Sequence, residues 1–234
     1  MRLYIIRHAD PDYANDAITD AGHQEALALA ERFASHGLDR IFCSPLGRAR
    51  ATMNYTAERL NMAFAIEEWL AEISEWPIPI GGKSSAAWNV AGQSIRCQSP
   101  LPTKMDWYTR APFDQPIFKQ RYEQIQRSSD GFLERLGYVR EGGQYRVLRP
   151  DNNQKIAAFC HGGIGLTWLA HLLEIPVPLM WAGFVLLTTS VTTVLFEERE
   201  AGWAVPRCLH LADVSHLYKS ELPVQRAGLV ANAD

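Results

Sequence analysis

The pattern of apolar and polar positions predicts three units in which a short buried strand leads through a loop into a helix. Each strand is a brief apolar run, and each helix shows apolar residues at helical spacing, with Thr19 placed to cap the first helix. The three pairs are residues 3–6 with 18–34, 40–43 with 48–60, and 155–160 with 166–173. Strands that alternate with helices form parallel sheets, so we predict an α/β fold with a mostly parallel central sheet flanked by helices.

Two more strands are expected near the carboxyl end of the chain. Residues 190–196 and 203–211 flank a charged turn at 197–202 and would complete the sheet. Residues 179–196 carry no charge and reach the length of about 18 residues at which a membrane helix becomes possible. Hydroxyl side chains interrupt this stretch and its end has the β-branched character of a core strand, so we predict no membrane partner.

The character of the sequence changes over residues 77–149. Prolines, glycines and small polar residues come first, and a charged amphipathic stretch follows at 118–136. Binding residues concentrate on loops that a rigid scaffold holds. We therefore predict a single domain over residues 1–234, in which 77–149 form an insertion that acts as a lid. A solvated extension is the alternative.

Cationic and imidazole side chains follow each of the three predicted parallel strands. Arg7 and His8 come directly after the first strand, Arg48 lies in the Ser-Pro-Leu-Gly-Arg-Ala-Arg segment after the second, and His161 follows the third. Because the carboxyl ends of parallel strands share one edge of the sheet, we expect these side chains to form one pocket. A phosphoryl group in transfer spreads negative charge over its oxygens, which arginine can meet with paired hydrogen bonds. A neutral imidazole can attack phosphorus, and a carboxylic acid should protonate the leaving oxygen.

Composition narrows the function classes. The net charge is −3 among 234 residues, which gives no basic surface of the kind that nucleic acid requires. Four cysteines occur without a CxxC pair, so neither a disulfide framework nor a zinc site is indicated. The amino terminus lacks the apolar length of a signal peptide. We therefore expect a cytoplasmic protein.

Four motifs resemble those of the histidine phosphatase, or phosphoglycerate mutase-like, superfamily. They are Arg7-His8, the Ser-Pro-Leu-x-Arg-Ala pattern ending at Ala49, His161-Gly162-Gly163, and residues 213–217. The resemblance covers roughly residues 1–60 and 155–217. It implies that His8 becomes phosphorylated, that Arg7, Arg48 and His161 hold the phosphoryl oxygens, and that water then releases phosphate. It implies no metal and no organic cofactor.

The resemblance also points to a proton donor. Leu70-Ala71-Glu72 matches the family's usual Leu-x-Glu pattern, so Glu72 is the predicted general acid and base, with Asp10 and Glu75 as alternatives. The first motif departs from the family, with Ala9 in place of glycine and Asp10 in place of glutamate. Asn15 is one position out of register, and Cys160 replaces a serine.

Several other residues compete for roles. Arg50, rather than Arg48, could hold the phosphoryl oxygens, but its position does not fit the family spacing. Cys160 could be a thiolate nucleophile, but no phosphate-cradling loop follows it. The resemblance suggests that His216 is a structural residue near the pocket. The tryptophans of the middle region could line a cavity or pack the insertion, namely Trp69, Trp76, Trp88 and Trp107.

The sequence thus predicts a phosphoric monoester hydrolase, similar to the histidine acid phosphatases, whose partner is a small-molecule phosphate ester. Three other functions are weighed against it: a phosphoglycerate-type mutase, a phospho-ligand binding module that has lost turnover, and a protein-phosphohistidine phosphatase. The mutases that it resembles carry a Ser-x-x-Asn continuation that this chain lacks. The physiological substrate is left open, and a homodimer is one candidate assembly.

Overall fold

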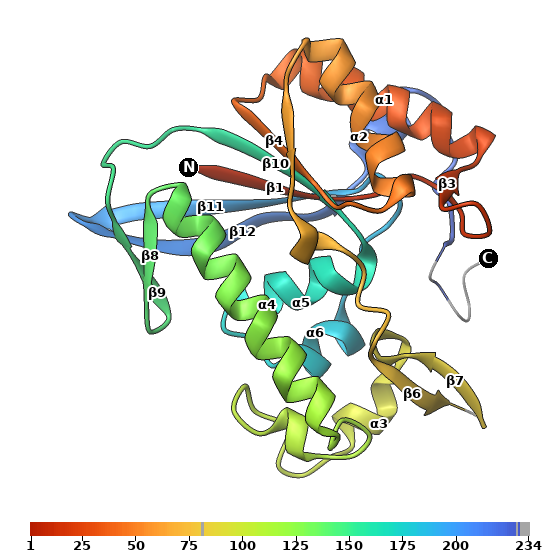
Figure 1. Ribbon diagram of the computed structural model, residues 1–234, viewed down its shortest axis with the longest axis vertical. Helices are drawn as coiled ribbons and strands as arrows, with labels where there is room; N and C mark the ends of the chain where they lie inside the picture. The colour runs from red at the N-terminus through yellow and green to blue at the C-terminus, as the bar shows by residue number, and fades with distance from the viewer. Residues whose placement is uncertain (81, 228, 230–234) are drawn as a thin grey trace.

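The computed structural model describes residues 1–80, 82–227 and 229, and an eight-stranded sheet runs through its centre (Figure 1). From edge to edge the strands are β5 (Phe64–Ile66), β4 (Arg40–Cys43), β10 (Lys155–Cys160), β1 (Arg2–Arg7), β11 (Val191–Glu200), β12 (Trp203–Asp213), β9 (Gln144–Val147) and β8 (Tyr138–Glu141).

The sheet is parallel at one end and antiparallel at the other. β1, β10, β4 and β5 run parallel, with Ile5 opposite Ala158 in the pair that β1 and β10 form. β11, β12, β9 and β8 run antiparallel to their neighbours. The three predicted strand and helix units supply β1, β4 and β10, so the α/β fold is confirmed, with its parallel strands gathered at one end.

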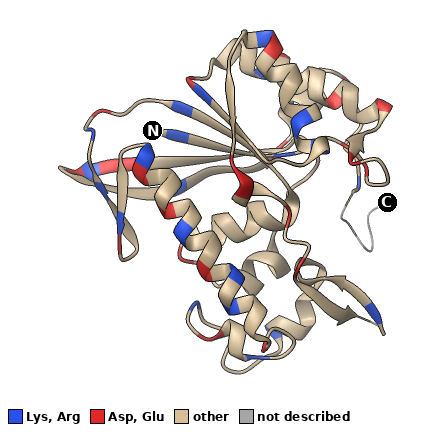
Figure 2. Ribbon diagram, viewed as in Figure 1, with Lys and Arg blue, Asp and Glu red and all other residues tan. Residues whose placement is uncertain are grey.

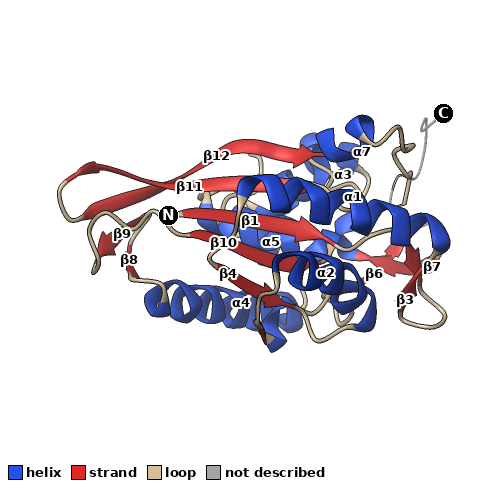
Figure 3. Cartoon of the chain, turned by 90° about the horizontal axis from the view of Figure 1, so that it is seen from above, coloured by secondary structure: helices blue, strands red, loops and turns tan. Residues whose placement is uncertain are grey.

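Helices cover both faces of the sheet (Figures 1 and 3). One face carries α1 (Asp20–His36), α2 (Gly47–Leu60) and α7 (Ser215–Lys219), and the other carries α4 (Pro116–Arg135), α5 (Gly162–Leu172) and α6 (Val177–Gly183). Strand side chains alternate between faces, so Tyr4 and Ile6 pack in the cluster of α1 and α2, whereas Leu3 and Ile5 pack in that of α5. Burial on both faces explains why β1 is continuously apolar.

The loop after β1 is held at its far end and in its middle. At its far end, Thr19 caps α1 as the sequence predicts, because its Oγ1 accepts a hydrogen bond of 3.1 Å from the Gly22 N–H. Between His8 and this helix, the short strands β2 (Pro11–Asp12) and β3 (Ala17–Ile18) pair with each other. The segment that carries the first motif is therefore fixed relative to the sheet.

Residues 77–149 form two parts. The first comprises β6 (Pro77–Ile80), β7 (Lys83–Ala86), α3 (Gly92–Arg96) and the 3-10 turns η2 (Ala87–Asn89) and η3 (Trp107–Thr109). The second comprises α4 and the hairpin of β8 and β9, which extends the sheet beyond β12. Trp76 and Trp107 are buried in the same cluster as Phe118 of α4 and Ile5 of β1. The core is continuous from the sheet into this segment, and the lid function of the segment stays a prediction.

Two element boundaries differ from the sequence prediction by more than two residues. α5 begins at Gly162 rather than at residue 166, because its first N–H groups bond to a carboxylate from a distant part of the chain. β11 runs on to Glu200, so most of the predicted charged turn is strand, where Glu197 pairs with Arg207 at 2.8 Å. Within the part of the chain that the structure describes, no helix is long and apolar enough to cross a membrane.

Candidate active site

The loops that follow β1, β4 and β10 meet at one edge of the sheet, on the side that carries β6 and β7 (Figure 1). A cavity of about 740 Å³ opens there, and Arg7, His8, Arg48 and Glu72 line it. The ring of His161 lies against that of His8, with 5.1 Å between the ring centroids. The structure therefore brings the five predicted site residues together, while their chemical roles stay predictions.

His8 is buried and held in one tautomer. Its Nδ1 lies 2.7 Å from the carbonyl oxygen of Ala9, which can only accept a hydrogen bond, so Nδ1 carries the proton. Burial, followed by the nearby Arg7 guanidinium, lowers the pKa of His8 to about 3. The ring is therefore neutral at ordinary pH, and Nε2 keeps the lone pair that a nucleophile needs.

Three buried nitrogen atoms of the site have no hydrogen-bond partner among the described residues. They are the Nε–H groups of Arg7 and Arg48 and the ring nitrogen Nδ1 of His161. The other ring nitrogen of His161, Nε2, lies 2.8 Å from Ser44 Oγ. An unsatisfied buried donor costs about 1–3 kcal/mol, and the unpaired Nε–H groups of two arginines that line one cavity are suited to an anion with several oxygens.

Burial and the neighbouring His8 hold the pKa of His161 well below its usual value, so this ring is also neutral. Arg7 and Arg48 thus supply the positive charge of the site. Arg7 Nη1 donates hydrogen bonds to the carbonyl oxygens of Leu186, at 2.6 Å, and Ala227, at 2.9 Å, which fix the orientation of the guanidinium.

Asp16 is a residue of the site that sequence reasoning missed. Its carboxylate accepts hydrogen bonds of 2.6 Å from Arg48 Nη1 and from the Gly47 N–H. Burial alone would raise the pKa of Asp16, but these hydrogen bonds outweigh it and the pKa lies below its usual value. Asp16 directly follows Asn15, the residue one position out of register, and this shift was the available signal.

Glu72 lies at the amino terminus of α5, just after the 3-10 turn η1 (Glu68–Leu70). Its carboxylate accepts hydrogen bonds from the N–H groups of Gly163, at 3.0 Å, and Ile164, at 2.8 Å. Burial raises the pKa of Glu72, and the N–H donors only partly oppose this. A carboxyl group with a raised pKa in the wall of the cavity can carry a proton for a leaving group.

The other two candidate acids, Asp10 and Glu75, have partners outside the cavity. Asp10 accepts a hydrogen bond of 2.7 Å from Thr19 Oγ1, and Glu75 forms an ion pair with Arg121 of α4. Neither lines the cavity. Of the three carboxylates that the sequence offered, the structure places only Glu72 beside His8 and the arginines.

Arg50, Asn15 and Cys160 also lie outside the cavity, whereas Trp88 of the middle region lines it. Arg50 is exposed on α2, and Asn15 is exposed and donates to Asp12. Cys160 is buried, and its burial raises the pKa of the thiol above its usual value, which disfavours a thiolate.

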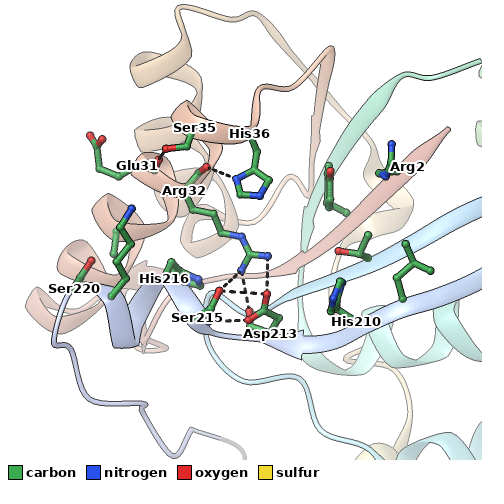
Figure 4. A pocket seen from close by; sticks show the side chains of 15 residues that line it. Arg2, Glu31, Arg32, Ser35, His36, His210, Asp213, Ser215, His216 and Ser220 are labelled. Carbon is green, nitrogen blue, oxygen red and sulfur yellow. Dashed lines mark hydrogen bonds and ion pairs between the residues drawn. The ribbon is translucent and has the colours of Figure 1, made fainter.

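His216 lies in the wall of a second cavity, of about 870 Å³, between α1, β12 and α7 (Figure 4). There Arg32 pairs with Asp213 at 2.7 Å. His216 Nε2 lies 3.1 Å from Thr189 Oγ1, and the Thr189 N–H donates to the carbonyl oxygen of His8 at 3.2 Å. His216 therefore touches the site through Thr189, as a structural neighbour of His8.

Comparisons with known proteins concern the family and the fold. Residues 3–78 match the family model of the histidine phosphatase superfamily (branch 1). No curated protein matches the chain in sequence. In the part of the chain that the structure describes, no group of three or more His, Cys, Asp or Glu side chains could hold a metal ion.

Solved structures share the fold over most of the chain. Phosphoserine phosphatase from Entamoeba histolytica, in complex with 3-phosphoglyceric acid, has a TM-score of 0.61 and 19% identity over 92% of this chain and 98% of its own. A mycobacterial glucosyl-3-phosphoglycerate phosphatase has a TM-score of 0.58 and 19% identity over 88% of this chain and 96% of its own. At this identity the likeness establishes the fold.

Proposed function

We propose that this chain, whose family match and fold are those of the histidine phosphatase superfamily, hydrolyses a small-molecule phosphate monoester through a phosphohistidine at His8. One observation carries the proposal. A neutral His8 lies in the same cavity as two arginines and Glu72, and His161 packs against its ring. Structural neighbours named as phosphatases of phosphoserine and of glucosyl-3-phosphoglycerate support a small molecule as the substrate.

The first step transfers the phosphoryl group to His8. Nε2 attacks phosphorus with its lone pair, and the bond between phosphorus and the ester oxygen breaks, leaving its electron pair on that oxygen. Glu72 gives its proton to this oxygen, so the alcohol leaves neutral and Glu72 becomes a carboxylate. The hydrogen bond from Nδ1 to Ala9 holds the His8 ring as positive charge develops on it.

The second step returns the enzyme to its starting state. Water attacks phosphorus, Glu72 takes up a proton from it, and the bond between phosphorus and Nε2 breaks toward the ring. Throughout, Arg7, Arg48 and His161 donate to the oxygens that carry the transferred charge. Removal of one donor of this kind costs a factor of about 10²–10³ in kcat.

The test is the intact mass of protein quenched within milliseconds of mixing with p-nitrophenyl phosphate. We expect one base-stable, acid-labile phosphoryl adduct in the wild type and none in His8→Ala. His210→Ala, an exposed histidine on β12, is the matched control and should keep the adduct. Tight binding of the ester without adduct or product would instead support a binding module, and transfer between the two phosphoglycerates would support a mutase.

A further inference from the structure

The cavity that contains His8 extends well beyond the phosphate-binding groups. At about 740 Å³ it is far larger than a phosphoryl group, and its remaining wall comes mainly from β6, β7, η2 and the loop after α6. That wall includes Ile80, Trp88, Trp181, Phe184 and Val185. Figure 2 shows the hairpin of β6 and β7 and α6 almost free of charged residues.

The charged residues that line the cavity all belong to the phosphate end. Arg7, Arg48 and Glu72 are the only Lys, Arg, Asp or Glu among the described lining residues. The residues outside the described ranges include no Lys, Arg or His. Lys83 and Arg96 are exposed and do not line the cavity, although Arg96 Nη2 lies beside Gly183 at the end of α6. Among the described lining residues, a second anionic group on a substrate would therefore find no cation other than Arg7 and Arg48.

Trp88 joins this apolar wall to the proton donor. A Cβ placed on Gly163 would lie 2.6 Å from the Trp88 ring and 2.8 Å from Glu72 Oε1. The indole and the carboxyl group thus both pack against the first turn of α5. An alcohol that Glu72 has just protonated must emerge beside this indole.

Two exposed apolar side chains continue the wall outward. Phe184 is 42% exposed and Val185 is 36% exposed, at the loop where α6 ends. Exposed apolar residues that adjoin a cavity mark a binding surface. Burial of an apolar group here is favourable, whereas an ionised carboxylate would lose water without gaining a cationic partner from the described wall.

We infer that the substrate is a phosphate monoester of an uncharged, apolar alcohol, and that the wall formed by Ile80, Trp88, Trp181, Phe184 and Val185 selects against esters of hydroxy acids. This inference rests on the proposed function. In the bound ester, the chain or ring of the alcohol lies against Trp88, and the phosphate faces Arg7 and Arg48.

The experiment compares n-hexyl phosphate with the phosphate ester of 6-hydroxyhexanoate, which differs from it by a terminal carboxylate and has a leaving oxygen of similar basicity. We expect kcat/KM to be at least tenfold higher for hexyl phosphate. Equal or better turnover of the carboxylate ester overturns the inference, as does failure to hydrolyse either ester while p-nitrophenyl phosphate is consumed. If p-nitrophenyl phosphate is not consumed, the proposed function fails. In that case, calorimetry measures the affinities for hexyl phosphate and for the carboxylate ester, and equal or tighter binding of the carboxylate ester overturns the inference.

Two variants test whether the residues of the wall cause the preference for the uncharged ester. Trp88→Ala should lower kcat/KM for hexyl phosphate at least tenfold more than for methyl phosphate, because methyl phosphate cannot reach the wall. Equal losses would show that Trp88 acts only by positioning Glu72. Val185→Lys should raise the ratio of the carboxylate ester to hexyl phosphate at least fivefold, and an unchanged ratio would contradict the assignment. Tyr218→Ala, 72% exposed on α7, is the control that should leave every ratio unchanged.

Discussion

Arg48 and Asp16 form an ion pair of 2.6 Å at the phosphate end of the cavity. One of the two cations of the site is therefore partly neutralised before any substrate arrives. The Asp16 side chain is 44% exposed, so the pair is partly screened by water. This arrangement orients Arg48 and at the same time weakens the attraction of the site for a dianion.

Asp16→Asn should strengthen the binding of inorganic phosphate about threefold or more, because it removes a negative charge near the anion while its amide oxygen can still accept from Arg48. The measurement is the inhibition constant of phosphate against p-nitrophenyl phosphate at low and high salt, and the gain should shrink at high salt. Asp12→Asn, half-buried in β2 and close to Asp16 in the sequence, is the control. Weaker phosphate binding would show that orientation of Arg48 outweighs the charge.

Glu72→Gln should separate the two chemical steps. An alkyl ester needs an acid to leave, so its kcat should fall by about 10²-fold or more. p-Nitrophenolate needs little help, so the variant should still release one equivalent in a burst and then stall, because dephosphorylation lacks its base. Rapid-quench kinetics measure the burst. Glu75→Gln, whose carboxylate pairs with Arg121, should behave as the wild type; the loss of both phases in Glu72→Gln would point to a role in folding or phosphate binding.

The sequence predicted the part of the fold that regular periodicity encodes. β1, β4 and β10 are continuous apolar runs because both of their faces are buried, and the polar residues after them mark the edge where a site can form. This is why Arg7, His8, Arg48 and His161 could be grouped from the order of strands and loops along the chain. The resemblance added Glu72, which no periodicity identifies.

The remainder depends on contacts between distant segments. The early start of α5 results from a carboxylate some 90 positions away, since the Gly163 N–H bonds to Glu72 with a separation of 91 residues. Asp16 reaches Arg48 from a loop whose register the family pattern does not fix. Trp88 lines the cavity whereas Trp76 is buried, and nothing in their local sequence distinguishes them. Tertiary packing decides all three.

The pH dependence should show that His8 resists protonation. Its pKa of about 3 means that the nucleophile stays neutral at about pH 5, where an ordinary histidine with a pKa of ~6.5 would be mostly protonated. The rate of phosphorylation by an alkyl ester should therefore persist at pH 5 and fall as the pH rises through the raised pKa of Glu72. Protonation of the His8 ring near pH ~6.5 in an NMR titration of the free enzyme would contradict this assignment; the rate alone does not test it, because the alkyl ester itself ionises near pH ~6.

Glu25 should make folding stability depend on pH. Its carboxylate accepts hydrogen bonds from the Asp10 N–H, at 2.9 Å, and from Thr188 Oγ1, at 3.0 Å. Burial nevertheless raises the pKa of Glu25 from 4.5 to about 7. Because the folded state holds this proton more tightly than the unfolded state, the stabilisation is complete below pH ~4.5 and is lost as the pH rises through ~7.

Glu25→Gln keeps a neutral side chain of the same shape, so it should stabilise the protein at pH 8 relative to the wild type, by up to about 3 kcal/mol, and change little at pH 4.5. Denaturant unfolding at the two pH values measures the difference. Glu58→Gln, exposed on α2, is the control and should show no such pH dependence. A variant that is less stable at pH 8 would mean that the ionised carboxylate is the form that the hydrogen bonds support.

Gly163→Ala tests the contact between the proton donor and the apolar wall. The added Cβ would lie 2.6 Å from the Trp88 ring and 2.8 Å from Glu72 Oε1, closer than van der Waals contact allows, so both side chains must move. Gly163 lies in a helix and its N–H bonds to Glu72, so displacement of that carboxylate should lower kcat for alkyl esters at least tenfold. The folding stability of the variant, followed by thermal unfolding, should change far less than the rate does, because alanine favours a helix over glycine by about 1 kcal/mol.

Gly131→Ala, in α4 with open space at its Cβ, is the matched control and should raise stability without changing the rate. Full activity in Gly163→Ala would mean that Glu72 can give up its place at the start of α5 without cost, and Glu72 would then lose its assignment as the proton donor.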